Sequence, residues 1–516
     1  MQDATVTTRP RRSLVGTGGC LTCRIRKVKC DEAKPACCKC RSTGRTCDGY
    51  SVLPFTRTEL LQGSLRQGHG SKLAAAGRSL AQTMLIDGAF RGKLEQRYFQ
   101  FFRCCTVACT NLTVDSPFWD RVILQAFHAE PAVKHAVLAL AAMHSGMLDR
   151  QDEHVSRQHM LYAKEQYTVA LGEARQLVTN AAPTQIHRVL IVCLLFVAWE
   201  GVRGDYQASQ RHMDSGRALA ARFHLQMGQK ASLAGIVHEI MQVLARMDIS
   251  AISFSDDSAP YRSPGQQSAE SDRQLCIDTF TSIQEASASL MEITRQLLRL
   301  GSEIIPGIDE AEAAQRQSDI DKYSRHLNEW AVHWEKWCAA NKISSRFMAI
   351  LNVRLWFACA KALVETGFRG PESRYDKATD MFRDVVSFSD KLASAIFQES
   401  GAVSLSLDLG YMIPTFFVAT RCRDPSIRRR ALGVLQSYPR HEGAWQSGPA
   451  AVIAERWIAV EESGLVDVHE AAQIPESHRV VLMEVQVRKS DGQARLRFQL
   501  AGIHGACSVV EETVSW

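Results

Sequence analysis

Seven of the 16 cysteines lie within residues 20–47, which read CLTCRIRKVKCDEAKPACCKCRSTGRTC. Without Cys38, the other six follow the spacing C-x2-C-x6-C twice, because adding 17 to positions 20, 23 and 30 gives 37, 40 and 47. A C-x2-C pair brings two thiolates onto one tight turn, where both can reach the same tetrahedral zinc ion. The stretch is therefore predicted to be a metal module built from two similar halves.

The number of ligands constrains how zinc is held. Two tetrahedral zinc ions need eight ligand bonds, and six cysteines supply eight only if two of them bridge. The internal repeat makes the first cysteine of each half, Cys20 and Cys37, the predicted bridges. The first ion is then held by Cys20, Cys23, Cys30 and Cys37, and the second by Cys37, Cys40, Cys47 and Cys20. The seventh thiol, Cys38, lies outside the repeat and is expected at the solvent edge.

Two observations favour zinc over a disulfide scaffold. The opening residues, MQDATVTTRPRRS, contain no apolar segment of the kind that directs secretion, so we expect the thiols to be kept reduced inside the cell. A stretch of 28 residues is also too short to bury a hydrophobic core. Metal binding is therefore expected to supply its folding free energy.

Residues 20–47 resemble the six-cysteine binuclear zinc cluster of fungal transcription factors. The resemblance implies a nuclear, DNA-binding regulator of RNA polymerase II genes, with two Zn²⁺ ions as cofactors and the transcription machinery as partner. It also implies two short helices, each following a C-x2-C pair, joined by a loop that contains Pro35.

The distribution of charge points to the same end of the chain. Residues 1–50 hold 11 Lys and Arg against four Asp and Glu, a balance of +7, whereas the other 466 residues carry 50 basic and 51 acidic groups. Six thiolates and two Zn²⁺ would lower the balance of residues 1–50 to about +5. Such asymmetry predicts contact with a nucleic acid or an anionic surface at one end.

The two halves of the module differ in their number of basic residues. Four of the six residues between Cys23 and Cys30 are basic, against two in the matching stretch 41–46, so the first helix is the better candidate for the DNA major groove. In the family this helix enters the groove at a G-rich triplet, typically CGG. Arg26 and Lys27 match the base-reading positions, with Lys27 the stronger candidate. The predicted phosphate contacts are Arg24, Lys29, Lys39, Arg41 and Arg45.

The segments flanking the module are predicted to lack a packed core. Residues 1–19 form a basic amino terminus whose Arg9, Arg11 and Arg12 suit either a nuclear-import signal or a disordered tail. Residues 48–92 form a linker rich in Gly, Ser, Arg and Gln. Its leucines do not keep a heptad period, so no coiled coil is predicted. The protein is expected either to bind as a monomer or to form a homodimer through the larger domain.

Residues 93–516 are predicted to form a large, mainly α-helical regulatory domain that ends in a β-hairpin. Helical periodicity appears in the following segments: 131–147, 153–178, 183–199, 205–224, 231–252, 276–302, 311–340, 344–366, 374–399, 426–437 and 449–463. A loop is predicted at 255–273, and alternation around Ser490-Asp491-Gly492 predicts the hairpin at 480–500. The longest apolar run, residues 189–199, is too short to span a bilayer, so no membrane contact is expected.

Several stretches of this domain also resemble the fungal-specific regulatory domain that accompanies such zinc clusters. They are Phe118-Trp119, residues 125–133, Gly204-Asp205-Tyr206 with His212, Cys422-Arg423-Asp424-Pro425, and Ile474-Pro475-Glu476. The resemblance implies control of gene activation or repression. Many such relatives regulate one metabolic gene cluster, in some cases a secondary-metabolite cluster.

No catalytic motif points to an enzyme. The chain lacks G-x-S-x-G, a Walker-type loop and H-E-x-x-H. The histidines 128, 135 and 144 are interpreted as core or surface residues. The cysteines 104, 105 and 109 are interpreted as packing thiols, and the tryptophans 330, 334 and 337 as a core stripe. The alternative to a DNA-reading factor is a zinc-stabilised nuclear scaffold or corepressor that acts through protein contacts.

Overall fold

The computed structural model describes residues 28–31, 33, 37–43, 90, 92–113, 116–149, 152–180, 185–227, 231–253, 279–302, 310–341, 347–400, 404–488, 492–501 and 508–516. The chain divides into two units, Met1–Gly63 and Ser64–Trp516. In the first unit, helix α2 (Cys38–Arg41) is the described element of secondary structure. The linker up to residue 89 and the loop predicted at 255–273 lie outside the described residues.

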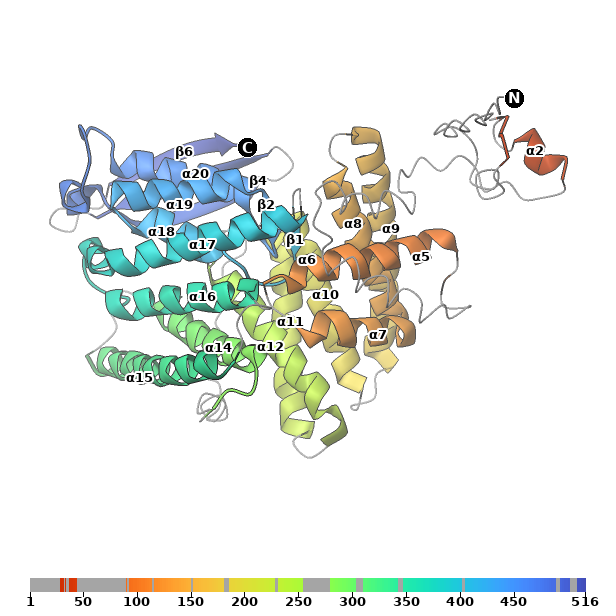
Figure 1. Cartoon of the computed structure of the whole chain (residues 1–516), viewed down its shortest axis with the longest axis horizontal. Helices are drawn as coiled ribbons and strands as arrows, with labels where there is room; N and C mark the ends of the chain where they lie inside the picture. The colour runs from red at the N-terminus through yellow and green to blue at the C-terminus, as the bar shows by residue number, and fades with distance from the viewer. Residues whose placement is uncertain are drawn as a thin grey trace, which may run out of the picture. The chain divides into compact units, whose positions relative to one another are not determined.

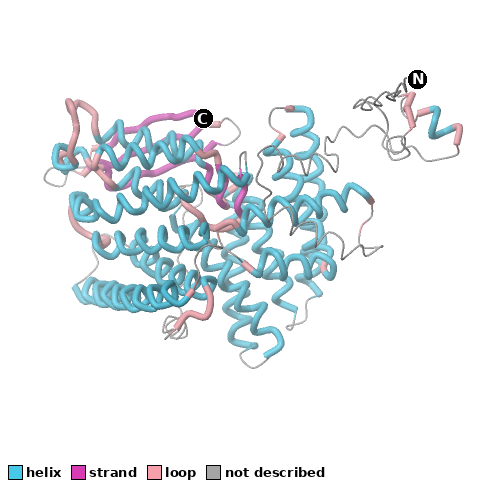
Figure 2. The backbone as a smooth tube through the Cα atoms, viewed as in Figure 1, coloured by secondary structure: helices cyan, strands magenta, loops and turns pink. Residues whose placement is uncertain are grey.

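Within the described residues, the first part of the second unit is built from helices alone (Figures 1 and 2). They are α5 (Lys93–Phe101), the π-helical turn η1 (Phe102–Thr106), α6 (Val107–Asn111), the π-helical turn η2 (Phe118–Val122), α7 (Ile123–Ala129), α8 (Pro131–Leu148), α9 (Glu153–Asn180), α10 (Ile186–Arg203), α11 (Tyr206–Met227) and α12 (Ala231–Ser253). Phe90, within the range assigned to the linker, packs its ring at a tilt against Phe99 and Phe127, with ring centroids 5.4 and 5.9 Å apart.

Helix α8 forms the centre of this part. Pro131 takes the favoured first helical position, and nearly every later residue is buried. Helices α5, α7, α9 and α10 all pack against it. Gly146 allows the close crossing with α9, because a Cβ there would lie 3.1 Å from the Cβ of His159. An apolar, alanine-rich helix is thus stabilised by partners on every side.

The second part continues as stacked helices and ends in a sheet. Its elements are α14 (Ile283–Ser302), α15 (Glu310–Ala340), α16 (Phe347–Thr366), the 3-10 helix η5 (Glu372–Ala378), α17 (Thr379–Ser400), α18 (Met412–Arg421), α19 (Pro425–Ser437) and α20 (Ser447–Glu461), followed by the short 3-10 turns η6 (Ala471–Gln473) and η7 (Glu476–His478). Figure 1 shows them as successive layers from α15 to the terminal strands. One apolar core runs from Ile249 on α12 to Ala454 on α20.

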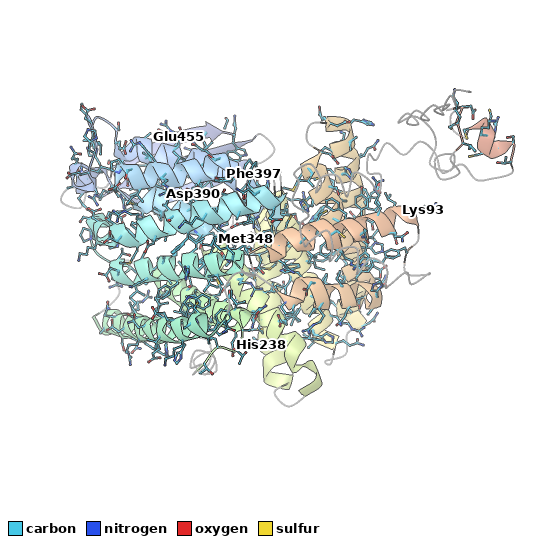
Figure 3. The ribbon with its side chains drawn as sticks, viewed as in Figure 1. Lys93, His238, Met348, Asp390, Phe397 and Glu455 are labelled. Atoms are coloured by element: carbon cyan, nitrogen blue, oxygen red, sulfur yellow. The ribbon has the colours of Figure 1, made fainter. Side chains whose placement is uncertain are left out.

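Exposed ion pairs and aromatic contacts support the layers from outside. Asp390 on α17 pairs with Arg430 on α19 at 3.0 Å, and the exposed Phe397 lies 5.9 Å from the ring of Tyr438 (Figure 3). Exposed pairs of this kind contribute little to stability. The apolar core must therefore supply most of the stabilisation.

Two small sheets complete the described fold. In the first, β1 (Ser404–Ser406) pairs in parallel with β2 (Arg440–Glu442), which pairs antiparallel with β3 (Trp445–Gln446). In the second, β4 (Val480–Arg488), β5 (Gln493–Leu500) and β6 (Val509–Ser515) form an antiparallel meander. Its inner face packs Leu496 and Phe498 against Trp457 of α20. The predicted hairpin is confirmed, and β6 is a third strand that the prediction lacked.

Most of the predicted helices are confirmed, with shifted ends. Helix α14 begins at Ile283 rather than 276, because the Ser282 hydroxyl accepts from the N–H of Glu285 and the Glu285 carboxylate accepts from the N–H of Thr281. The single helix predicted at 374–399 is a 3-10 helix followed by α17. Pro183, predicted to begin a helix, lies outside the described residues, and α10 begins at Ile186.

Short motifs that carry the family resemblance mark helix ends. Gly204 has a φ of 74°, in the left-handed region, and ends α10, while the carboxylate of Asp205 accepts from the N–H of Ala208 at the start of α11. Asp424 caps α19, whose first residue is Pro425. These residues therefore act as local stops and starts of helices.

Buried charges tie distant segments together. The fully buried Glu461 accepts from Arg423 at 2.7 Å, from Arg428 at 2.7 Å and from the N–H of Val480 at 2.9 Å. Burial alone would raise the pKa of Glu461, but the two guanidinium groups outweigh burial and lower it below its usual range. The carboxylate therefore stays ionised inside the core.

Helix α16 is long and apolar enough, by length and composition, to cross a bilayer. In the structure, 61 % of its apolar window is buried against neighbouring parts of the protein. The core helix of a water-soluble fold has the same composition. Burial of this extent fits a core helix.

Candidate metal centre and nucleic-acid interface

Helix α2 is set by residues of the second C-x2-C pair. Cys37 is the N-cap, in an extended conformation, and its sulfur accepts from the N–H of Cys40 at 3.3 Å. Both side chains are fully buried. The helix therefore begins within the cysteine pair, whereas the resemblance implied a helix following it.

Asp31 provides a second cap for α2. Its carboxylate accepts from the N–H groups of Cys38 and Lys39 at 2.9 and 3.2 Å. The hydrogen bond from Cys38 is the main cause that lowers the pKa of Asp31 to about 2. Negative charge at a helix start is favourable. Asp31 was not among the predicted site residues, although an acidic residue directly after the third cysteine is visible in the sequence.

Three ligand-type groups converge beside this helix. The sulfurs of Cys30 and Cys37 and a carboxylate oxygen of Asp31 all lie within 4.8 Å of one another. Both Asp31 oxygens already accept backbone hydrogen bonds, so Asp31 positions the start of α2, and the two sulfurs are the candidate metal ligands. Cys30 and Cys37 were predicted to share the first zinc ion, and their proximity fits that prediction.

The donor set suits zinc. Thiolate sulfur is a preferred zinc ligand, and the buried pair Cys37 and Cys40 has the N–H···S contact that steadies a thiolate on a tight turn. Bound zinc would hold the ends of this segment together, since the described residues supply no apolar core for it. Of the six predicted ligands, Cys20, Cys23 and Cys47 lie outside the described residues.

The predicted DNA contacts are partly described. Lys29, Lys39 and Arg41 are exposed, and the last two lie on α2. Arg24, Arg26, Lys27 and Arg45 lie outside the described residues. Cys38 is exposed on the same helix, as expected for the thiol outside the repeat.

In the larger unit, most of the cysteines and tryptophans singled out in the sequence act as packing residues. Burial raises the pKa of Cys105 to about 12, so this thiol stays protonated and is a poor metal ligand or nucleophile. Within the described residues, no group of metal ligands includes Cys104, Cys105 or Cys109. Trp330 and Trp334 are buried and stacked at 5.5 Å, which confirms a core stripe.

The histidines 128, 135 and 144 divide between core and surface positions. His135 and His144 are buried on α8, while His128 is exposed on α7. The ring nitrogen of His144 lies 2.9 Å from the hydroxyl of Thr106, and complete burial lowers the pKa of His144 to about 4. A neutral imidazole in this position contributes to packing and to one hydrogen bond.

Comparison with known proteins finds a different family domain in each of the two units. The fungal Zn(2)-Cys(6) binuclear cluster domain matches residues 18–54, and the fungal specific transcription factor domain matches residues 97–358. The chain is 24 % identical to the aspercryptin biosynthesis cluster-specific transcription regulator of Emericella nidulans, over 90 % of this chain and 91 % of that protein.

Two further relatives cover smaller shares. A transcription regulator of Purpureocillium lilacinum, lscL, is 31 % identical over 39 % of this chain and 48 % of that protein. The transcriptional regulatory protein moc3 of Schizosaccharomyces pombe is 62 % identical over 6 % of each chain. The protein thus belongs to the fungal-specific transcription factors that carry a Zn(2)-Cys(6) binuclear cluster, a family of transcription regulators and not of enzymes.

Proposed function

We propose that this protein binds two Zn²⁺ ions and reads CGG-type triplets in double-stranded DNA, in the nucleus, to regulate genes transcribed by RNA polymerase II. The observation that carries the proposal is the repeated C-x2-C-x6-C spacing with four basic residues between Cys23 and Cys30. Arg26 and Lys27 read guanine edges, since Arg and Lys are the usual partners of guanine O6 and N7.

The remaining basic residues hold the duplex. The exposed Lys29, Lys39 and Arg41, together with Arg24 and Arg45, contact phosphates. Such contacts make affinity fall steeply with salt but add little sequence preference. The helical unit, with a nearly neutral balance of charge, supplies regulation and contacts with the transcription machinery or with a second copy of the chain.

We infer that the regulated genes form a metabolic cluster, in keeping with a secondary-metabolite pathway. The support is the name of the relative that matches along most of the chain, a cluster-specific transcription regulator. Mapping of bound sites across the genome, paired with transcript changes on deletion, tests this assignment. Bound sites scattered without a cluster would contradict it.

Fluorescence anisotropy with the full-length, zinc-loaded protein tests DNA reading. Lys27→Ala should weaken binding to a CGG duplex by about 1–3 kcal/mol relative to a scrambled duplex. Lys34→Ala removes the same charge from the loop predicted between the halves, and it should weaken binding to both duplexes equally. Absence of any zinc-dependent preference for CGG in the wild-type protein would favour the scaffold or corepressor alternative.

A further inference from the structure

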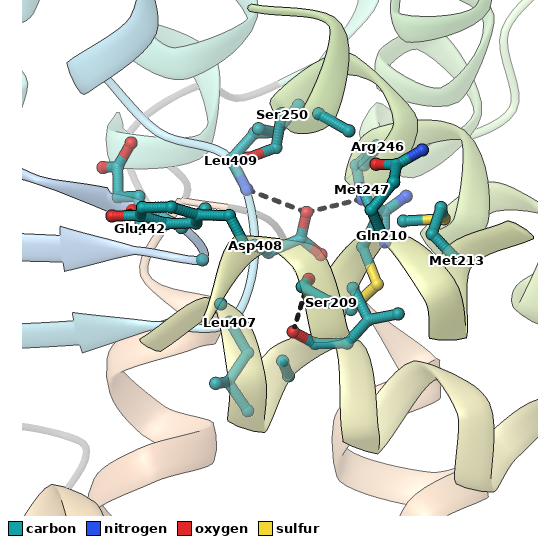
Figure 4. A pocket seen from close by; sticks show the side chains of 17 residues that line it. Ser209, Gln210, Met213, Arg246, Met247, Ser250, Leu407, Asp408, Leu409 and Glu442 are labelled. Atoms are coloured by element: carbon teal, nitrogen blue, oxygen red, sulfur yellow. Dashed lines mark hydrogen bonds and ion pairs between the residues drawn. The ribbon is translucent and has the colours of Figure 1, made fainter. Parts of the chain in front are cut away.

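A cavity lies inside the helical unit, where three helices meet two loops from much later in the chain. Its walls come from α10, α11 and α12 and from residues 407–409 and 442–444 (Figure 4). It measures about 60 Å³ and is partly open to the outside. One water needs roughly 10–15 Å³ on this scale, so the cavity can enclose about four to six non-hydrogen atoms.

The lining is mainly apolar. Val197, Ala198, Met213, Met247 and Leu407 contribute side chains from four different segments. Methionine adapts its shape readily to a partner. An apolar cavity with a few convergent polar groups is the usual form of a small-molecule site.

The charged groups of the wall are already satisfied. Arg246 donates through Nε to Asp408 at 2.7 Å, and the other carboxylate oxygen of Asp408 accepts from the indole of Trp119 at 3.3 Å. Figure 4 shows the Arg246–Asp408 pair and the bond from the N–H of Leu409 to Asp408. A charged ligand would therefore lose its hydration without gaining a free partner in this pair.

Glu442 is occupied in the same way. Its carboxylate accepts from the N–H groups of Gly410 at 3.0 Å and Met412 at 3.1 Å, and from Nε of Arg440 at 2.6 Å. This acid caps the start of α18 from 30 residues away. It leaves no unbalanced negative charge to attract a cationic ligand.

One hydroxyl in the wall differs from these groups. Ser250 Oγ is buried and has no hydrogen-bond partner within the described part of the chain. It faces Gly443, where an added Cβ would lie only 3.7 Å away, so the missing side chain of Gly443 leaves room in front of the hydroxyl. A buried hydroxyl without a partner costs stability, which a ligand could recover.

We propose that this cavity binds a small, uncharged molecule with an apolar body of about four to six non-hydrogen atoms and one hydrogen-bonding group directed at Ser250. The apolar lining contacts the body of the ligand. The paired charges reject ionised molecules of the same shape. The ligand also joins α10–α12 to the loops at 407–409 and 442–444.

Three compounds of one shape test the class of ligand: 2-methylpropan-1-ol, 2-methylpropanoate and 2-methylpropylammonium. The full-length protein is labelled with ¹³C in its methionine methyl groups, so Met213 and Met247 report on the cavity and the other methionines serve as reference. We expect the alcohol to shift these two signals in a saturable way, and the two ions to leave them unchanged at the same concentration. Equal responses to all three compounds, or no saturable response to the alcohol, would overturn the proposal.

Variants on one helix test the role of the hydroxyl. Ser250→Ala should weaken alcohol binding about five- to tenfold. Ser250→Ala should fold and be at least as stable as the wild-type protein, because it removes a buried hydroxyl that has no partner within the described residues. Ser253→Ala is the matched control, since its Oγ is also buried without a partner but does not line the cavity. The same loss in both variants, or in neither, would contradict the assignment of Ser250.

Discussion

The zinc module and the helical unit keep their buried residues in place by opposite means. In the module, the described buried side chains are Cys37, the N-cap of the four-residue helix α2, and Cys40 on that helix. In the helical unit, one apolar core extends from α12 to α20 and also encloses ionised groups such as Glu461. We therefore expect the module to depend on a metal ligand for its folding, whereas the helical unit depends on packing.

The two regions also differ in whether their functional sites can be recognised from the sequence alone. Metal binding is encoded by spacing within 28 residues, so it is visible in the sequence. The proposed cavity gathers residues near positions 200, 250, 408 and 443, which only folding brings together. A site whose residues are distant in the sequence leaves no local sequence pattern from which it could be predicted.

Removal of zinc should produce the largest difference between the two regions. Structural zinc contributes about 10–16 kcal/mol in small zinc domains, so a chelator should unfold the module. Hydrogen exchange should then show loss of protection at the N–H groups of Cys38 and Lys39, which donate to Asp31. Peptides from α8 serve as the internal control and should keep their protection. Loss of protection in α8 as well would contradict independent folding.

Disruption of the buried charge network around Glu461 should cause the next largest change, a loss of folding stability. Glu461→Gln leaves Arg423 and Arg428 without their shared carboxylate, and removing one partner of a buried pair costs about 3–5 kcal/mol. Urea unfolding followed by circular dichroism measures the loss. Glu462→Gln, the neighbouring and less buried acid, should cost less than about 1 kcal/mol. Similar losses in the two variants would show that burial of the network contributes little.

Acidification should lower the stability of the helical unit by a smaller amount. The folded protein holds the pKa of His144 at about 4, below the ordinary value of 6.5, because the ring is buried. The unfolded chain therefore binds more protons between these pH values, and stability contributed by neutral His144 is lost as pH falls from 6.5 toward 4. The loss amounts to at most about 3 kcal/mol.

The pH effect is measured as urea unfolding at pH 7 and pH 4.5. His144→Gln should lose less stability than the wild-type protein over this interval, because glutamine does not titrate. His154→Gln, at an exposed position on α9, should follow the wild-type protein. An unchanged pH dependence in His144→Gln would contradict the assignment to His144.

Local signals explain which parts of the fold could be predicted. Pro131 and the apolar stripe after it predicted α8, and the alternation around Gly492 predicted β4 and β5. These features act through neighbours in the chain. The cysteine repeat is local in the same sense, which is why the sequence leads to the metal module.

Long-range contacts explain what was missed. Helix α18 was not among the predicted segments, and its start is capped by Glu442, which lies 30 residues away from Met412. Strand β6 buries only Val514 and depends on pairing with β5. The π-helical turn η1 interrupts the ordinary helical period between α5 and α6, so no regular stripe marks that segment.

The neighbouring thiols Cys37 and Cys38 allow the most direct test of the central claim, that the repeated cysteines form a zinc module on which DNA binding depends. Cys37 is buried and predicted to bridge two zinc ions, whereas Cys38 is exposed and outside the repeat. The measurement is anisotropy of a CGG duplex titrated with each full-length Cys→Ser variant at defined free zinc. We expect Cys37→Ser to lose zinc-dependent binding and Cys38→Ser to retain wild-type affinity. Retention of binding by Cys37→Ser, or equal loss in both variants, would contradict the claim.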